Sequence, residues 1–151
     1  MSIHEILRAA ITYFAIVFGA GFVLGPIRIL FVVPHLGERV AELLEAPLML
    51  IVIVLAARWV VRRFQLPARP VFRLGVGLIA FGLGLVFELA LILKLRGLTL
   101  AEYFETRDPI AATVYYLTLV LFALMPLLLT KHEFKAKSHA KAQRHKERLS
   151  A

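Results

Sequence analysis

The chain has 151 residues, of which 60% are hydrophobic and only 19% are charged, and its mean hydropathy is +0.81. Soluble domains typically contain about 45–50% apolar and about 25% charged residues, so this composition argues against a soluble globular protein. The sequence has no cysteine, which excludes disulfides, thiolate metal sites and thiol catalysis. The formal net charge of +8 comes from charges gathered in a few places, with long uncharged stretches between them.

Four apolar stretches are long enough to form membrane-spanning helices. A helix needs about 20 mainly apolar residues to cross the hydrocarbon layer, and the stretches predict spans at about 9–30, 46–63, 72–94 and 109–130. Four helices this apolar could not hide one another in so small a chain, which favours membrane helices over core helices. We therefore expect an all-α, polytopic membrane protein whose four spans form one domain over residues 1–130.

The basic residues fall mainly on one side of these spans. Thirteen Lys and Arg residues lie in the N-terminal segment, in the link between the second and third spans and in the C-terminal tail, against five in the two opposite loops. Loops rich in Lys and Arg stay in the cytoplasm. We therefore expect a multi-pass protein of the inner (cytoplasmic) membrane with both termini in the cytoplasm.

The two halves of the chain resemble each other in sequence. The matching segments occur in the same order, and they are 18–23 with 81–86 and 41–45 with 101–105. These matches predict a tandem duplication of a two-helix hairpin, with repeat units at about 8–64 and 71–130. Because each unit has two spans, the two copies would have the same orientation in the membrane.

The two extracytoplasmic loops carry helix signals. Thr99 and Glu102 have the spacing of a capping box, and Asp108 stands before Pro109 as the expected N-cap of the fourth span. In the first loop, apolar residues between positions 36 and 44 share one helical face while glutamates occupy another. We therefore expect a short amphipathic helix at the membrane surface in each loop.

The first loop also contains a weak candidate for a metal site. Four residues there, at spacings of three, four and three, lie along one helical face, and they are His35, Glu38, Glu42 and Glu45. Side chains of these types can bind a hard or borderline metal. The alternative is the solvated face of an interfacial helix with Arg39 among the acids. We favour this alternative and expect no metal.

Glu88 interrupts the otherwise uncharged third span. An ionised carboxylate at that depth is costly unless it faces a protein interior or a polar cavity. Small residues that permit close helix packing share its face or the corresponding face of the first span, and they are Gly21, Gly25, Gly77 and Gly84. The duplication equates Gly25 with Glu88, and Arg28 follows one turn farther out. We therefore predict that the two glycine faces meet and that Glu88 forms an intramembrane ion pair with Arg28.

The C-terminal tail, residues 131–151, is strongly basic and has too few apolar residues to build a core. Lys and Arg beside a span are attracted to anionic lipid head groups, by about 1 kcal/mol per charge. We expect such contacts at the cytoplasmic face from Arg62, Arg63, Lys131, Lys135, Lys137, Lys141 and Arg144. Nucleic acid would be attracted by the same charge, but the tail lacks the interleaved aromatic residues that would support it, and we expect no nucleic-acid partner.

The sequence contains no recognisable set of catalytic residues. The serines lie near the termini, there is no glycine-rich phosphate loop, and no pair of carboxylates converges within the spans. All five histidines lie outside the predicted spans, so we expect neither haem nor any other cofactor. We therefore expect a non-catalytic accessory or structural subunit that packs in a homo- or hetero-oligomer. The alternative is a small oligomeric transporter or channel that uses Glu88 as a proton- or cation-coupling site.

Overall fold

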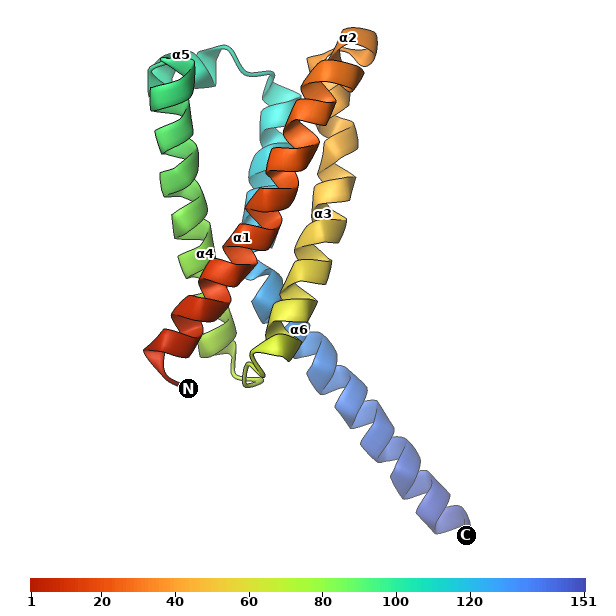
Figure 1. Ribbon diagram of the computed structural model, residues 1–151. Coiled ribbons are helices and arrows are strands. Elements are labelled where there is room, and N and C mark those ends of the chain that lie inside the picture. Colours follow the sequence, from red (N-terminus) through yellow and green to blue (C-terminus); the bar gives the residue numbers. More distant parts are fainter.

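The computed structural model describes all 151 residues and is entirely helical (Figure 1). Its elements, in chain order, are α1 (Ile3–Ile27), the π-helical turn η1 (Arg28–Val32), α2 (Val33–Leu36), α3 (Glu38–Arg63), α4 (Pro70–Leu91), the π-helical turn η2 (Ile92–Arg96), α5 (Leu100–Glu105) and α6 (Pro109–Ser150). Four continuous helical stretches are long and apolar enough to span a membrane, and they are Ile3–Leu36, Glu38–Arg63, Pro70–Arg96 and Pro109–Ser150. The prediction of an all-α chain with four candidate spans is confirmed, and the four helices suggest a multi-pass membrane protein.

The four long helices alternate in direction along the bundle. As a result, the N-terminus and the α3–α4 link lie at one end, which is also the end from which the C-terminal part of α6 projects (Figure 1). The short helices α2 and α5 lie at the opposite end. We call these two ends the termini end and the loop end.

The tightly packed core lies in the half of the bundle nearer the termini end. Its buried side chains in the long helices are Ala9, Ala10, Tyr13, Val17, Ile53, Ala56, Ala57, Val60, Val61, Val76, Ala80, Phe122 and Met125. Many are small, which lets neighbouring helix backbones approach closely. The hydroxyl of Tyr13 donates a hydrogen bond of 2.8 Å to the carbonyl oxygen of Phe122, and the two rings stack at 4.7 Å. The polar group is therefore satisfied where apolar surroundings would make an unpaired hydroxyl costly.

Arg73 connects three segments at the termini end. Its side chain is only 2% exposed. It donates to the carbonyl oxygens of Pro67 and Leu66, at 3.2 and 3.3 Å, and forms a 2.9 Å ion pair with Glu133. The sequence groups Arg73 with the other basic residues of the link, but the structure buries it between the α3–α4 link and α6.

The first loop differs from the prediction. α3 begins at Glu38 and continues through Pro47 without interruption, so the predicted surface helix is instead the first part of α3. The connection to α2 is the single residue Gly37, whose φ of 83° is accessible to glycine without steric cost. Proline can be accommodated inside apolar helices, and Pro47 lies within α3 without beginning a new helix.

The helix caps in the second loop are confirmed. α5 has the Thr99–Glu102 capping box, with both reciprocal hydrogen bonds present. Asp108 caps α6 by accepting hydrogen bonds from the backbone N–H groups of Ile110 and Ala111, at 3.1 and 3.0 Å.

The C-terminal tail is a direct continuation of α6. The helix passes through Pro126 and extends to Ser150, and its last part leaves the bundle at the termini end (Figure 1). From Lys131 onwards every residue except Glu133 is exposed. The basic residues expected to contact lipid head groups are all exposed: Arg62, Arg63, Lys131, Lys135, Lys137, Lys141 and Arg144.

Candidate functional site

A cleft of about 600 Å³ occupies the half of the bundle nearer the loop end. Its volume is within the range of about 300–1,000 Å³ that is typical of small-molecule sites. All four long helices contribute to its walls, together with η1, η2 and α5. Its apolar lining includes Phe18, Phe22, Met49, Ile53, Leu119 and Phe122. The two π-helical turns also line it, and such turns occur frequently at functional sites.

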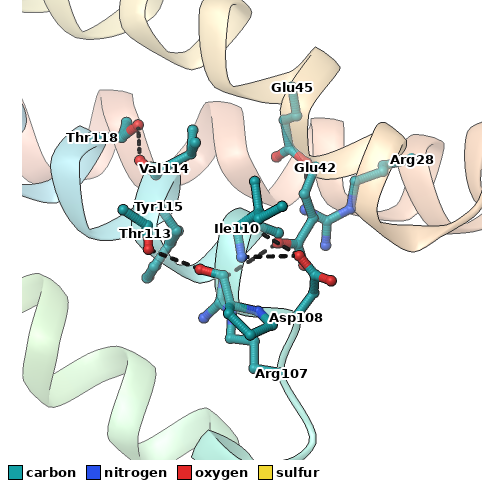
Figure 2. Close-up of polar contacts among 12 residues, drawn as sticks. Arg28, Glu42, Glu45, Arg107, Asp108, Ile110, Thr113, Val114, Tyr115 and Thr118 are labelled. Carbon is teal, nitrogen blue, oxygen red and sulfur yellow. Dashed lines mark hydrogen bonds and ion pairs between the residues drawn. The ribbon is translucent and has the colours of Figure 1, made fainter.

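Charged side chains form two ion pairs within this cleft (Figure 2). Nη1 of Arg28, from η1, lies 2.6 Å from Oε2 of Glu45. Nη2 of Arg107, from the loop before α6, lies 3.6 Å from Oε2 of Glu42. All four side chains are less than one-quarter exposed. The two glutamates are three residues apart on α3, so each faces an arginine from a different element.

Glu88 is held by two tyrosines from other helices. The hydroxyl of Tyr103, on α5, donates to Oε1 of Glu88 at 3.4 Å, and the hydroxyl of Tyr115, on α6, donates to Oε2. Such hydrogen bonds reduce the cost of removing a carboxylate from water. Burial raises the pKa of Tyr103 above its ordinary value, so this residue is a neutral donor at physiological pH.

The structure does not form the predicted ion pair between Glu88 and Arg28, because Arg28 pairs with Glu45 instead. The prediction assumed that the glycine faces of the first and third spans meet. A Cβ added at Gly25 would have no neighbour within 4 Å, and one at Gly21 would meet only Cε of Met49 at 3.9 Å. Both glycines line the cleft, so the glycine face of α1 borders this space and does not touch α4.

The two glycines of α4 do permit close helix contacts, with different partners. A Cβ at Gly77 would lie 1.9 Å from the carbonyl oxygen of Ala123 on α6. A Cβ at Gly84 would lie 2.6 Å from Cζ of Phe18 on α1. The absence of a side chain at these positions is therefore what brings α4 against both neighbours.

The four metal-site candidates do not converge in the structure. Nδ1 of His35 donates to the carbonyl oxygen of Phe31 at 2.9 Å. Glu42 and Glu45 face arginines, and Glu38 lines the cleft separately. No three His, Cys, Asp or Glu side chains lie close enough together to hold a metal ion.

Asp108 joins the loop-end edge of α3 to the start of α6. Besides capping α6, its Oδ2 accepts hydrogen bonds from Nε and Nη2 of Arg39, at 2.8 and 2.6 Å. These bonds from Arg39, with the capping N–H groups, hold the pKa of Asp108 below its ordinary value. A carboxylate with a lowered folded-state pKa contributes stability above its unfolded pKa, here about 3.9, and loses that contribution as the pH falls through the folded value.

We therefore expect Asp108→Asn to lower the thermal unfolding midpoint in detergent slightly at pH 7. Asparagine keeps the N-cap but removes the charge that pairs with Arg39, and exposed pairs contribute little. The difference from wild type should shrink as the pH falls below about 4, because the wild-type carboxylate then becomes protonated. A difference that stays constant down to pH 2 would mean that charge at position 108 is not its cause.

Three residues of the site were not anticipated from the sequence, and they are Tyr103, Arg107 and Tyr115. The available signal was Glu88 itself, because a carboxylate within a span needs a partner at the same depth on another element. Tyr115 meets that condition, since it lies seven residues inside the N-cap of α6.

No protein-family model, curated protein or solved structure matched the chain.

Proposed function

We propose that this chain is a multi-pass protein of the cytoplasmic membrane that takes up a small ligand in a cleft open to the outside, with Glu88 as the carboxylate coupled to binding. The supporting observation is the division of the bundle into two unlike halves. The half nearer the termini end has a close-packed core, whereas the half nearer the loop end contains the cleft and its charged network. A solute entering from the loop end would meet charged side chains first and would be stopped by the core.

The orientation follows from the distribution of basic residues. The termini end carries thirteen of the eighteen Lys and Arg residues, and most cytoplasmic loops are enriched in them. With this end in the cytoplasm, the cleft faces the outside and the exposed basic side chains of α6 face the inner lipid surface. At the loop end, Leu100 and Phe104 of α5 are exposed and four residues apart, which suits a helix lying on the outer membrane surface.

The tandem duplication belongs to the same proposal. Each half has a long helix that ends in a five-residue π-helical turn. The turns begin at Arg28 and Ile92, one position away from the register in which Phe18 aligns with Phe81. Since π-helical turns are rare, their recurrence at nearly equivalent positions supports a common origin of the two hairpins. The copies would then have diverged most at the loop end, where the cleft is lined differently by each half.

The accessory-subunit function is a second candidate, supported by a strip of α4 that faces away from the bundle. Gly75 and Gly82 are seven residues apart, and a Cβ at either would have no neighbour within 4 Å. Leu78, between them, is 51% exposed. Small residues on such a face allow another helix to approach closely. Native mass spectrometry after mild extraction would favour this function if it detected a partner chain bound to the wild-type protein and no such partner bound to Gly82→Leu.

Single-cysteine variants test the proposed cleft, because the natural chain has no cysteine. A membrane-impermeant maleimide added to intact cells should label Gly25→Cys, in the cleft, and Glu105→Cys, at the loop end. The two controls are Ala57→Cys in the core and Gly82→Cys on the apolar outer face. Both should stay unlabelled until denaturation, because only the thiolate reacts and a thiol in apolar surroundings away from water does not ionise. Ser138→Cys in the tail should react only after lysis.

Two outcomes would count against the proposal. Labelling of Gly25→Cys no faster than Gly82→Cys would mean that the cleft is not open to water from outside. Labelling of Ser138→Cys in intact cells would reverse the orientation, and the cleft would then face the cytoplasm.

A further inference from the structure

Arg107 occupies a cage of aromatic and acidic side chains inside the cleft. Its guanidinium carbon lies 4.2 Å from the ring centroid of Tyr115 and 5.4 Å from that of Tyr103. Its Nη2 lies 3.6 Å from Glu42, and both tyrosine hydroxyls donate to Glu88. Two aromatic faces with carboxylates beside them are the elements from which proteins build sites for organic cations.

The guanidinium of Arg107 is held loosely for so enclosed a group. It can donate five hydrogen bonds, but it donates only one, from Nη1 to the hydroxyl of Tyr103. By contrast, the more exposed Arg39 donates through both Nε and Nη2 to Asp108. Arg107 also belongs to the short connection between α5 and α6, so its side chain can leave the cage without moving a helix.

We infer that this cage is a binding site for an organic cation with an apolar body, and that Arg107 is an internal occupant which the ligand displaces. The inference rests on the proposed function of the cleft. A quaternary ammonium or guanidinium group would replace Arg107 between the tyrosine rings, facing Glu42 and Glu88. The apolar body would lie against Phe22 and other apolar side chains of the cleft.

The charges of the cleft favour a cation over an anion once Arg107 leaves. Arg28 is already neutralised by Glu45 at 2.6 Å. Displacement of Arg107 would leave the negative charge of Glu42 without its ion-pair partner. The positive charge of the incoming cation would then take the place of the Arg107 guanidinium. An internal competitor lowers the apparent affinity of a ligand by the fraction of molecules in which the site is free. Removing the competitor should therefore strengthen cation binding.

Calorimetric titration of the purified full-length protein in detergent with benzyltrimethylammonium tests the inference. We expect Arg107→Gln to bind this cation at least about tenfold more tightly than wild type, which is the gain when Arg107 leaves the cage free in no more than about one-tenth of wild-type molecules. The matched control is Arg96→Gln, since Arg96 also lines the cleft but has no hydrogen bond or ion pair. Arg96→Gln removes the same charge without emptying the cage. Its affinity for benzyltrimethylammonium should differ from that of the wild type by less than about threefold.

Two further variants examine the cage itself in the Arg107→Gln background. Tyr115→Leu removes an aromatic face at similar volume, and Glu88→Gln removes a carboxylate charge; each should abolish the gain in affinity. Phenylmethanesulfonate, which carries the same aromatic body on an anion, should not bind to the wild type or to Arg107→Gln.

A measurement on the wild type covers the case in which Arg107→Gln does not fold. Phenylglyoxal modifies accessible arginines, and mass spectrometry resolves the peptide that contains Arg107. Benzyltrimethylammonium should accelerate modification of Arg107 relative to Arg96, because the displaced side chain becomes exposed.

The inference would be overturned by equal affinity gains in Arg107→Gln and Arg96→Gln, by protection of Arg107 from phenylglyoxal, or by preferential binding of the sulfonate. If Gly25→Cys reacts with the maleimide while any of these results is obtained, the cleft stands and only the cation site fails. If Gly25→Cys is also unreactive, the proposed function fails as well.

Discussion

Replacing Gly77 by alanine is expected to destabilise the bundle by about 3 kcal/mol, and replacing it by leucine should prevent the native bundle from forming. A Cβ at this position would lie 1.9 Å from the carbonyl oxygen of Ala123 and 3.0 Å from its carbonyl carbon. Both are backbone atoms, so no side-chain rotation can relieve the contact. α4 and α6 would have to separate along their interface.

The expected magnitude follows from overpacking in other proteins. Extra methylene groups in a close-packed core typically cost about 1–3 kcal/mol, and occasionally more. The value at Gly77 should lie at or above the upper limit, because Ala123 and Pro126 are fixed within α6 and Val76 beside it is fully buried. The measurement is the unfolding free energy in mixed detergent micelles.

Gly75→Ala is the matched control for this prediction. Gly75 lies two residues away on the same helix, and a Cβ there would have no neighbour within 4 Å. Both substitutions change helix propensity equally, so their difference isolates the contact with Ala123. An unfolding free energy for Gly77→Ala within about 0.5 kcal/mol of the control would mean that the close approach of α4 and α6 is not real.

Replacing Arg73 by glutamine is expected to destabilise the termini end by about 3 kcal/mol. Removal of one partner from a buried ion pair typically costs about 3–5 kcal/mol. We expect the lower end because Glu133 is 43% exposed, so water partly compensates its charge. Most of the loss should come from the carbonyl oxygens of Leu66 and Pro67, which accept hydrogen bonds from Arg73 and would lose their donor.

Thermal unfolding and limited proteolysis of the α3–α4 link would measure the effect. Arg69→Gln removes an exposed arginine four residues earlier and should leave both readouts unchanged. Glu133→Gln should cost less than Arg73→Gln, about 1–2 kcal/mol, because the glutamine amide oxygen can still accept from Arg73 although the buried guanidinium loses its counter-charge. If Arg73→Gln and Glu133→Gln are equally destabilising, the ion pair rather than the two carbonyl contacts holds the link in place.

The sequence by itself determined the properties that depend on composition and on local spacing. Apolar length predicted four candidate spans, and the capping signals at Thr99 and Asp108 appear in the structure as predicted. A cap depends on atoms within three residues of one another, so no tertiary contact is needed to form it. The first loop differs from the prediction for a related reason: the predicted boundary at residue 46 separates a surface helix from the second span, whereas in the structure one helix continues through Pro47.

The tertiary structure alone decided the partners of the charged residues and the role of each glycine. The sequence correctly marked Glu88 as a residue that needs a partner, but it could not select Tyr103 and Tyr115 over Arg28. Successive residues of a helix rotate by roughly 100°, so a choice between partners requires the rotation and depth of every neighbouring helix.

That rotation is hard to infer for helices like these. A helix in water shows its buried side through an apolar stripe, whereas a helix that is apolar all round gives no such indication. Gly25 and Gly77 therefore looked equivalent in the sequence, although one faces the cleft and the other touches the backbone of α6. The same limitation concealed the cage around Arg107, which is assembled from α3, α4, α5, α6 and the loop between the last two.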